Sequence, residues 1–111
     1  MACPPKLYIN TVVKKVIPPG VASSDTAAWA AADVIDFSLV LTLESNPVTT
    51  VTYGFIAGDI VESGLNLLWT IPATGSKKIQ VPGKYLVSMR MTDAVGVRGL
   101  TPCPDYLEFF A

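Results

Sequence analysis

The sequence predicts an all-β protein, a single antiparallel β-sandwich of about seven strands with one short helix or loop near residues 23–32. We expect one domain over residues 1–111. Apolar residues alternate with a period of two in several segments, which places them on one face of a strand. Turn-forming residues separate these segments, and no long crossover of the kind that joins parallel strands is present.

In the N-terminal third of the sequence we expect a strand region followed by one connecting segment. Apolar residues recur over Lys6–Ile17, and Pro18-Pro19-Gly20 ends that run. The segment Ser23–Ala32 is the one helix candidate, because a serine can cap it and its alanines are good helix formers. An irregular crossover loop is the alternative.

Two segments carry the clearest strand pattern. In Asp33–Glu44 every odd position from Ile35 to Leu43 is apolar, and in Lys84–Thr92 the alternation runs from Tyr85 to Met91. Five further strands are expected at Val48–Ile56, Leu65–Ile71, Lys77–Val81, Val97–Leu100 and Asp105–Phe110.

Turn residues separate these strands. Ser45-Asn46-Pro47 and Pro82-Gly83 are turn signals, and Gly58–Gly64 is expected to be a loop. Asp93–Gly96 predicts a hairpin turn in which Gly96 adopts a positive φ. In Lys77–Val81 we expect Ile79 and Val81 to face inward.

The composition leaves two interpretations open. Half of the residues are hydrophobic, 15% are charged, the net charge is −1 and the mean hydropathy is +0.46. A compact sandwich fits, and so does a subunit that hides additional apolar surface in an assembly. The sequence has no cluster of basic residues that could bind the phosphates of a nucleic acid, so we expect no nucleic-acid partner. No apolar run is long enough to span a membrane, and the N-terminus has no signal-peptide core. We therefore expect synthesis in the host cytoplasm, followed by retention there or exit by a route other than a cleaved signal.

The sequence contains few residues of the types that catalyse reactions or bind metal ions. The chain has no histidine, which excludes the common nucleophile arrangements and removes the commonest metal ligand. Asp33 with Asp36, or Asp59 with Glu62, could contribute to a calcium site; solvated turn carboxylates are the alternative. We expect no enzyme activity, no metal and no cofactor.

The cysteines and aromatic residues suggest structural roles. Cys3 and Cys103 are either two free thiols or a disulfide between the termini. Trp69 is expected in the core, whereas Trp29 either plugs one end of the sandwich or anchors a neighbouring subunit. The candidate subunit contacts are Trp29, Val12, Val13, Tyr106, Phe109 and Phe110.

One stretch carries a resemblance to a known family. Pro82–Gly96 has the pattern PG-x-Y-x-V-x-x-x-x-T-D-x-x-G and resembles a hairpin of bacterial and phage Ig-like domains of the PKD and related types. Asp33 followed by Asp36–Leu43 is similar to the opening strand of phage baseplate and tail Ig-like modules, although Ala32 stands where those have glycine. The resemblance covers about a third of the chain and implies an Ig-like fold. It also implies that Tyr85 packs in the core and Asp93 caps the turn.

These observations lead to a functional expectation. We expect a bacteriophage virion protein, a capsid decoration subunit that stabilises the particle through contacts with coat or tail subunits and with its own copies. A tail or baseplate component, or a carbohydrate- or protein-binding adhesion module, is the alternative. An intracellular adaptor fits the sequence without being indicated by it.

Overall fold

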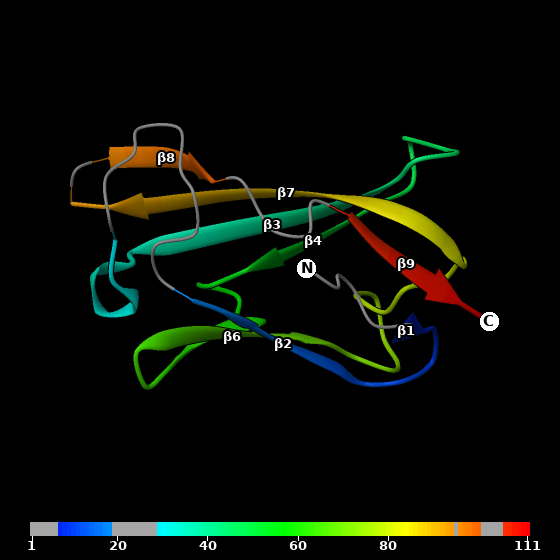
Figure 1. Ribbon diagram of the computed structural model, residues 1–111, viewed down its shortest axis with the longest axis horizontal. Helices are drawn as coiled ribbons and strands as arrows, with labels where there is room; N and C mark the ends of the chain where they lie inside the picture. Colours follow the sequence, from blue (N-terminus) through cyan, green and yellow to red (C-terminus); the bar gives the residue numbers. More distant parts are fainter. Residues whose placement is uncertain (1–6, 19–28, 95, 101–105) are drawn as a thin grey trace.

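The computed structural model describes residues 7–18, 29–94, 96–100 and 106–111. Within these residues the protein is all-β, with nine strands and one 3₁₀ turn, η1 (Ala31–Asp33). The strands are β1 (Leu7–Tyr8), β2 (Val13–Ile17), β3 (Asp36–Leu43), β4 (Thr50–Gly54), β5 (Ile60–Ser63), β6 (Asn66–Ile71), β7 (Gly83–Asp93), β8 (Gly96–Leu100) and β9 (Tyr106–Phe110). They form two sheets, which lie as two layers in Figure 1.

The larger sheet is built on the pair β3 and β7. Its strand order is β1-β9-β7-β3-β4, and β8 also pairs with β7. β3 pairs with β7 from Asp36↔Thr92 to Leu43↔Tyr85, and both strands lie where the alternation predicts them. β7 has 11 residues, so its other edge accommodates β9 along its first half and β8 along its second.

The core lies between the larger sheet and the three-stranded sheet β2-β6-β5. Alternate residues of β3 and β6 are buried, because each strand turns one face toward the other layer. These residues are Phe37, Leu39, Leu41 and Leu43 of β3, and Leu67, Trp69 and Ile71 of β6. Tyr53 of the larger sheet meets Trp69 of the smaller one edge to face, with ring centroids 5.4 Å apart. The predicted core positions of Trp69 and Tyr85 are therefore confirmed, with 3% and 1% of their surface exposed.

The hairpin between β7 and β8 is also confirmed. Gly96 has a φ of +138°, and its amide donates to Asp93 Oδ1 at 3.3 Å. Asp93 is buried, so its side chain caps the turn from inside the fold.

The predicted N-terminal strand region is two strands in two different sheets. β1 pairs with β9 in the larger sheet, whereas β2 pairs with β6 in the smaller one. Between them Asn10 adopts a φ of +64°, and Thr11 Oγ1 donates to the Tyr8 carbonyl at 2.6 Å. Asparagine tolerates this left-handed conformation better than most residues, so the chain reverses there and crosses to the second layer.

Three further expectations are corrected. Ile60–Ser63 is strand β5 rather than part of a loop. Lys77–Val81 forms no strand; Ile79 is buried, but Val81 is 44% exposed. The larger sheet is mixed rather than purely antiparallel, because β1 and β9 run parallel.

The helix candidate Ser23–Ala32 is described only from Trp29 onward, and Ser23–Ala28 lie outside the described residues. Ala30 is extended, with φ −123° and ψ 146°, and the following three residues form η1. The part of the segment that the structure describes is therefore a connecting loop with one 3₁₀ turn.

Candidate interaction surface

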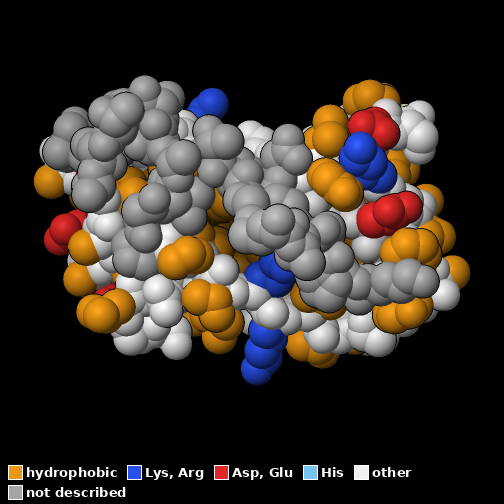
Figure 2. Space-filling view, viewed as in Figure 1, with side chains coloured by type: hydrophobic (Ala, Val, Ile, Leu, Met, Phe, Trp, Pro, Cys, Tyr) orange, Lys and Arg blue, Asp and Glu red, His pale blue; other side chains and the backbone are white. Residues whose placement is uncertain are grey.

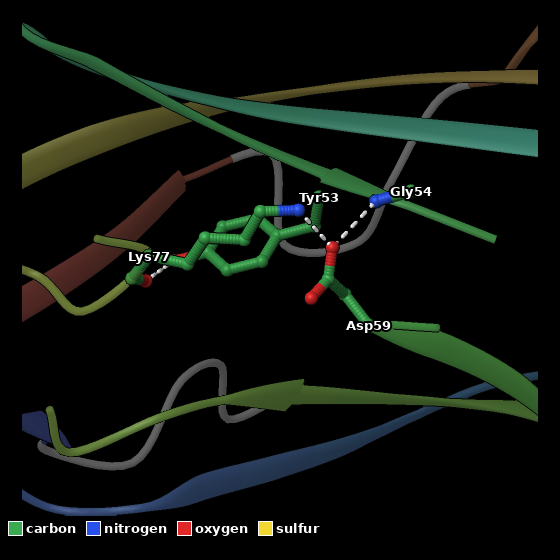
Figure 3. A network of polar contacts seen from close by, with 4 residues as sticks. All are labelled: Tyr53, Gly54, Asp59 and Lys77. Atoms are coloured by element: carbon green, nitrogen blue, oxygen red, sulfur yellow. Dashed lines mark hydrogen bonds and ion pairs between the residues drawn. The ribbon is translucent and has the colours of Figure 1, made fainter. Parts of the chain in front are cut away.

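A polar network joins the two sheets at the turn between β4 and β5 (Figure 3). Asp59 Oδ2 accepts a hydrogen bond from the Gly54 amide at 3.1 Å and pairs with Lys77 Nζ. The Tyr53 hydroxyl donates to the Lys77 carbonyl at 2.7 Å. Tyr53 belongs to the larger sheet and Asp59 immediately precedes the smaller one. The network therefore fastens the loop that carries Lys77 to the point where the chain changes sheets.

Two tyrosines have raised pKa values. Burial raises the pKa of Tyr53 well above its usual value, and the nearby Asp59 carboxylate raises it further. Burial also raises the pKa of Tyr85, whose hydroxyl donates to the Val81 carbonyl at 2.6 Å. Both hydroxyls donate to main-chain carbonyls and therefore hold loop segments to the larger sheet.

One member of each predicted carboxylate pair makes a local hydrogen bond. Asp36 Oδ1 accepts a hydrogen bond from the Phe37 amide at 2.9 Å, and Asp59 is engaged in the network described above. Glu62 lies on β5, at an exposed position. Within the described residues no three side chains of the metal-ligating types gather into a group that could hold an ion.

The candidate contact residues divide into buried and accessible ones. Trp29 and Phe109 are 6% and 2% exposed, so their rings lie in the core and not on a surface that a neighbour could reach. Trp29 packs against Phe37, with ring centroids 6.2 Å apart, and belongs to the hydrophobic core of the described residues. Phe109 meets Tyr85 edge to face at 5.7 Å.

The remaining candidates are accessible to different degrees. Val12 is 58% exposed, whereas Val13 is half-buried and packs against the core. Tyr106 and Phe110 are half-buried on β9, and Lys84 Nζ lies 4.5 Å above the Tyr106 ring centroid. Cys3 and Cys103 lie outside the described residues.

The outer face of the smaller sheet carries three neighbouring aliphatic side chains, which we call the aliphatic row. Leu68 of β6 is the cross-strand partner of Val16 on one side and of Val61 on the other. The adjacent inner positions, Trp69 and Leu67, point into the core, so the row points away from it. Val16 and Val61 are 59% and 44% exposed. The row is thus a continuous apolar strip across all three strands.

Other large hydrophobic residues are exposed elsewhere in the described part of the chain. Hydrophobic side chains occupy much of the described surface in Figure 2, and charged groups are sparse there. The exposed ones outside the row are Tyr8, Val12, Ile35, Val48, Ile56, Leu65, Val81, Leu86 and Val97. Single exposed hydrophobics are ordinary in folded proteins, so the row is the more informative feature.

Sequence reasoning missed the aliphatic row. Val16 falls within the predicted first strand region, but Val61 lies in a segment whose sequence predicts a loop. An alternation signal is absent there, because only Ile60 of the four β5 residues is buried. The register between β2, β6 and β5 brings the row together, and that register is a property of the folded sheet.

Comparison with known proteins gives no relative for this chain. No family model matches it, and neither a curated protein nor a solved structure is significantly similar to it. Among the described residues there is also no helix whose length and apolar character would let it cross a membrane.

Proposed function

We propose that this protein is a structural subunit of a bacteriophage virion, most specifically a capsid decoration subunit that stabilises the particle by contacts between subunits. The observation that carries the proposal is the aliphatic row, a solvent-facing apolar strip on a small domain in which Asp59, Lys77 and Tyr53 are engaged internally. The resemblance of Pro82–Gly96 to phage Ig-like domains supports the same class of protein.

The size of the row suits a repeated weak contact. Complete burial of a valine side chain stabilises by about 1.5–3 kcal/mol, and Val16 and Val61 each retain roughly half of their exposure. Covering both would therefore contribute about 1.5–3 kcal/mol at each contact. One such contact is too weak to hold a complex, but the same contact repeated over a particle lattice gives stable attachment.

The direct test is the protein content of phage particles from the source of this chain. Purified virions are analysed by quantitative mass spectrometry, and a decoration subunit should be present at a copy number comparable with that of the coat protein. A few copies per particle would indicate the tail or baseplate instead. Absence from the particles would contradict a virion role.

A variant test asks whether the aliphatic row makes the contact. Val16→Thr and Val61→Thr together keep the β-branched shape but place hydroxyls in the strip, so particle occupancy should fall. Val48→Thr is the matched control, because Val48 is 89% exposed in the turn between β3 and β4. Equal occupancy for the double variant and the control would remove the row from the contact.

One observation favours the alternative of a carbohydrate-binding module. Tyr8 is 47% exposed, and its ring lies 6.1 Å from that of Phe110 on the neighbouring strand. Exposed aromatic rings can stack on sugar faces, as they do on other planar or apolar ligand surfaces. A glycan array with the wild type and Tyr8→Ala tests this, since sugar binding that depends on Tyr8 would support the module and silence would count against it.

A further inference from the structure

The three-stranded sheet has two edges of opposite charge. Within the described residues β2 and β5 each pair on one side only, with the central strand β6. β2 carries Lys14 and Lys15, and β5 carries Glu62. None of these three side chains forms an ion pair in the described part of the chain. Each edge therefore presents main-chain donors and acceptors beside uncompensated charge.

The direction of the strands allows one edge to add to the other. β2 and β5 both run antiparallel to β6, so they run in the same direction as each other. A second copy in the same orientation would place its β2 alongside β5 of the first, as a parallel pair that continues the sheet. The two strands have similar lengths, 5 and 4 residues, so they match along the whole of β5.

The side-chain faces agree as well. Lys15 is the cross-strand partner of Trp69, and Glu62 is the partner of Leu67, so both occupy the inner face of the sheet at its edges. A register that places Glu62 opposite Lys15 of the next copy also places Ile60 beside Val13 on that face. The junction then brings an opposite-charge pair together on that face, and such a pair stabilises a sheet.

Charge selects this pairing over the symmetric ones. Two copies joined by their β2 edges would bring four lysines together, and two joined by β5 would bring glutamates together. Like charges across a sheet junction are destabilising, and lysine on an edge strand commonly serves to prevent such association. Only the β5-to-β2 combination is attractive, and it is a heterologous contact, which generates rings or filaments.

We propose that copies of this chain associate head to tail, with the β5 edge of one copy adding to the β2 edge of the next and Glu62 facing Lys15. This goes beyond the proposed function, because it concerns how purified copies join and requires no particle. The occupant of each edge is a second copy of the same chain.

Charge reversal tests the proposal in solution. Light scattering at low salt should show concentration-dependent association of the wild type. Lys15→Glu or Glu62→Lys alone should weaken that association by about tenfold. The matched control is Asp33→Lys, which reverses an exposed carboxylate in η1, outside both edge strands, and should associate as the wild type does.

Mixing the two single variants is the decisive step. In a 1:1 mixture, the lysine introduced on β5 of one variant can pair with the glutamate introduced on β2 of the other. The remaining native Glu62 and Lys15 can pair in the same way, so association should return. The double variant should also associate, since every junction then has the reversed pair. An unfolded variant could not be restored by mixing, so recovery also shows that both variants fold.

Two results would overturn the proposal. A wild type that stays monomeric up to about 1 mM would exclude edge association of useful strength, while leaving attachment to a particle through the aliphatic row untouched. Association that ignores both charge reversals, or that mixing fails to restore, would place the contact elsewhere. Failure of the head-to-tail contact is thus distinguishable from failure of the virion role.

Discussion

Replacing Tyr53 with phenylalanine isolates one hydrogen bond of the network between the sheets. The substitution removes the hydroxyl that donates to the Lys77 carbonyl at 2.7 Å and keeps the ring that packs against Trp69. Losing the bond and leaving a carbonyl without its donor should lower the free energy of unfolding by about 1–2 kcal/mol at neutral pH. For a domain of this size that corresponds to a fall in Tm of about 4–10 °C.

The same substitution has a second consequence at alkaline pH. Because the pKa of Tyr53 is raised in the folded state, the unfolded chain loses this proton near pH 10 while the folded chain keeps it. The unfolded state then binds fewer protons, so the free energy of unfolding falls by about 1.4 kcal/mol per pH unit above pH 10. Tyr85 acts in the same direction. Tyr53→Phe should therefore be less stable at pH 7.5 but less sensitive to pH above 10.

Urea unfolding followed by tryptophan fluorescence measures both effects, at pH 7.5 and in steps from about pH 9.5 to 11.5. Tyr8→Phe is the control, because Tyr8 is 47% exposed and its substitution should change neither stability nor slope. An alkaline slope unchanged by Tyr53→Phe would refute the assignment of Tyr53 as a buried proton donor.

Further substitutions test the fold by thermal or urea unfolding. Gly83→Ala should cost about 1–3 kcal/mol, because Gly83 has a φ of +145° and an added Cβ would lie 2.8 Å from Leu43 Cδ1; Gly58→Ala, with φ +89° and nothing within 4 Å, should cost only about 1 kcal/mol. Phe109→Ala should cost about 3–5 kcal/mol and Phe110→Ala about 1 kcal/mol, since only Phe109 is fully buried, and equal losses would contradict the alternation in β9. Trp29→Ala should lose about 3–5 kcal/mol, so a stable variant would return Trp29 to the surface as a contact residue.

The strand pattern in the sequence is clearest where one face of the strand is fully buried, as in β3 and β6. β3 alternates between buried and half-buried residues along its whole length, and that is the condition under which a period of two is visible in a sequence. Asp93 and Gly96 predicted the hairpin correctly because each has a local role in the turn. The Asp93 side chain caps the turn, and Gly96 adopts a positive φ. These features depend on neighbours in the chain.

The strands that were missed depend on distant partners. β5 buries only Ile60, so its sequence has no alternation, and pairing with β6 makes it a strand. β1 is 2 residues long and is held by a parallel pairing with β9, which lies at the opposite end of the chain. Lys77–Val81 contains the apolar residues of a strand, yet one of them, Val81, is exposed and no partner strand is present in the described residues.

The same division applies to the surfaces. Because both are hydrophobic, Phe109 and Phe110 were predicted to be subunit contacts. In the structure β9 turns Phe109 toward the core, where it is buried. The aliphatic row and the opposite charges at the edges of the smaller sheet arise from residues that belong to three separate strands. No local pattern reports which strands become neighbours or which become edges.

By itself the sequence determined the all-β class, the two central strands and the turns, because these follow from periodicity and backbone preference over a few residues. The tertiary structure alone decided the reversal at Asn10, the assignment of β1 and β2 to different sheets and the register that assembles the aliphatic row. The physical reason is that strand pairing and burial are long-range: a strand's partner, its inward face and its free edge are fixed only when the whole sheet has formed.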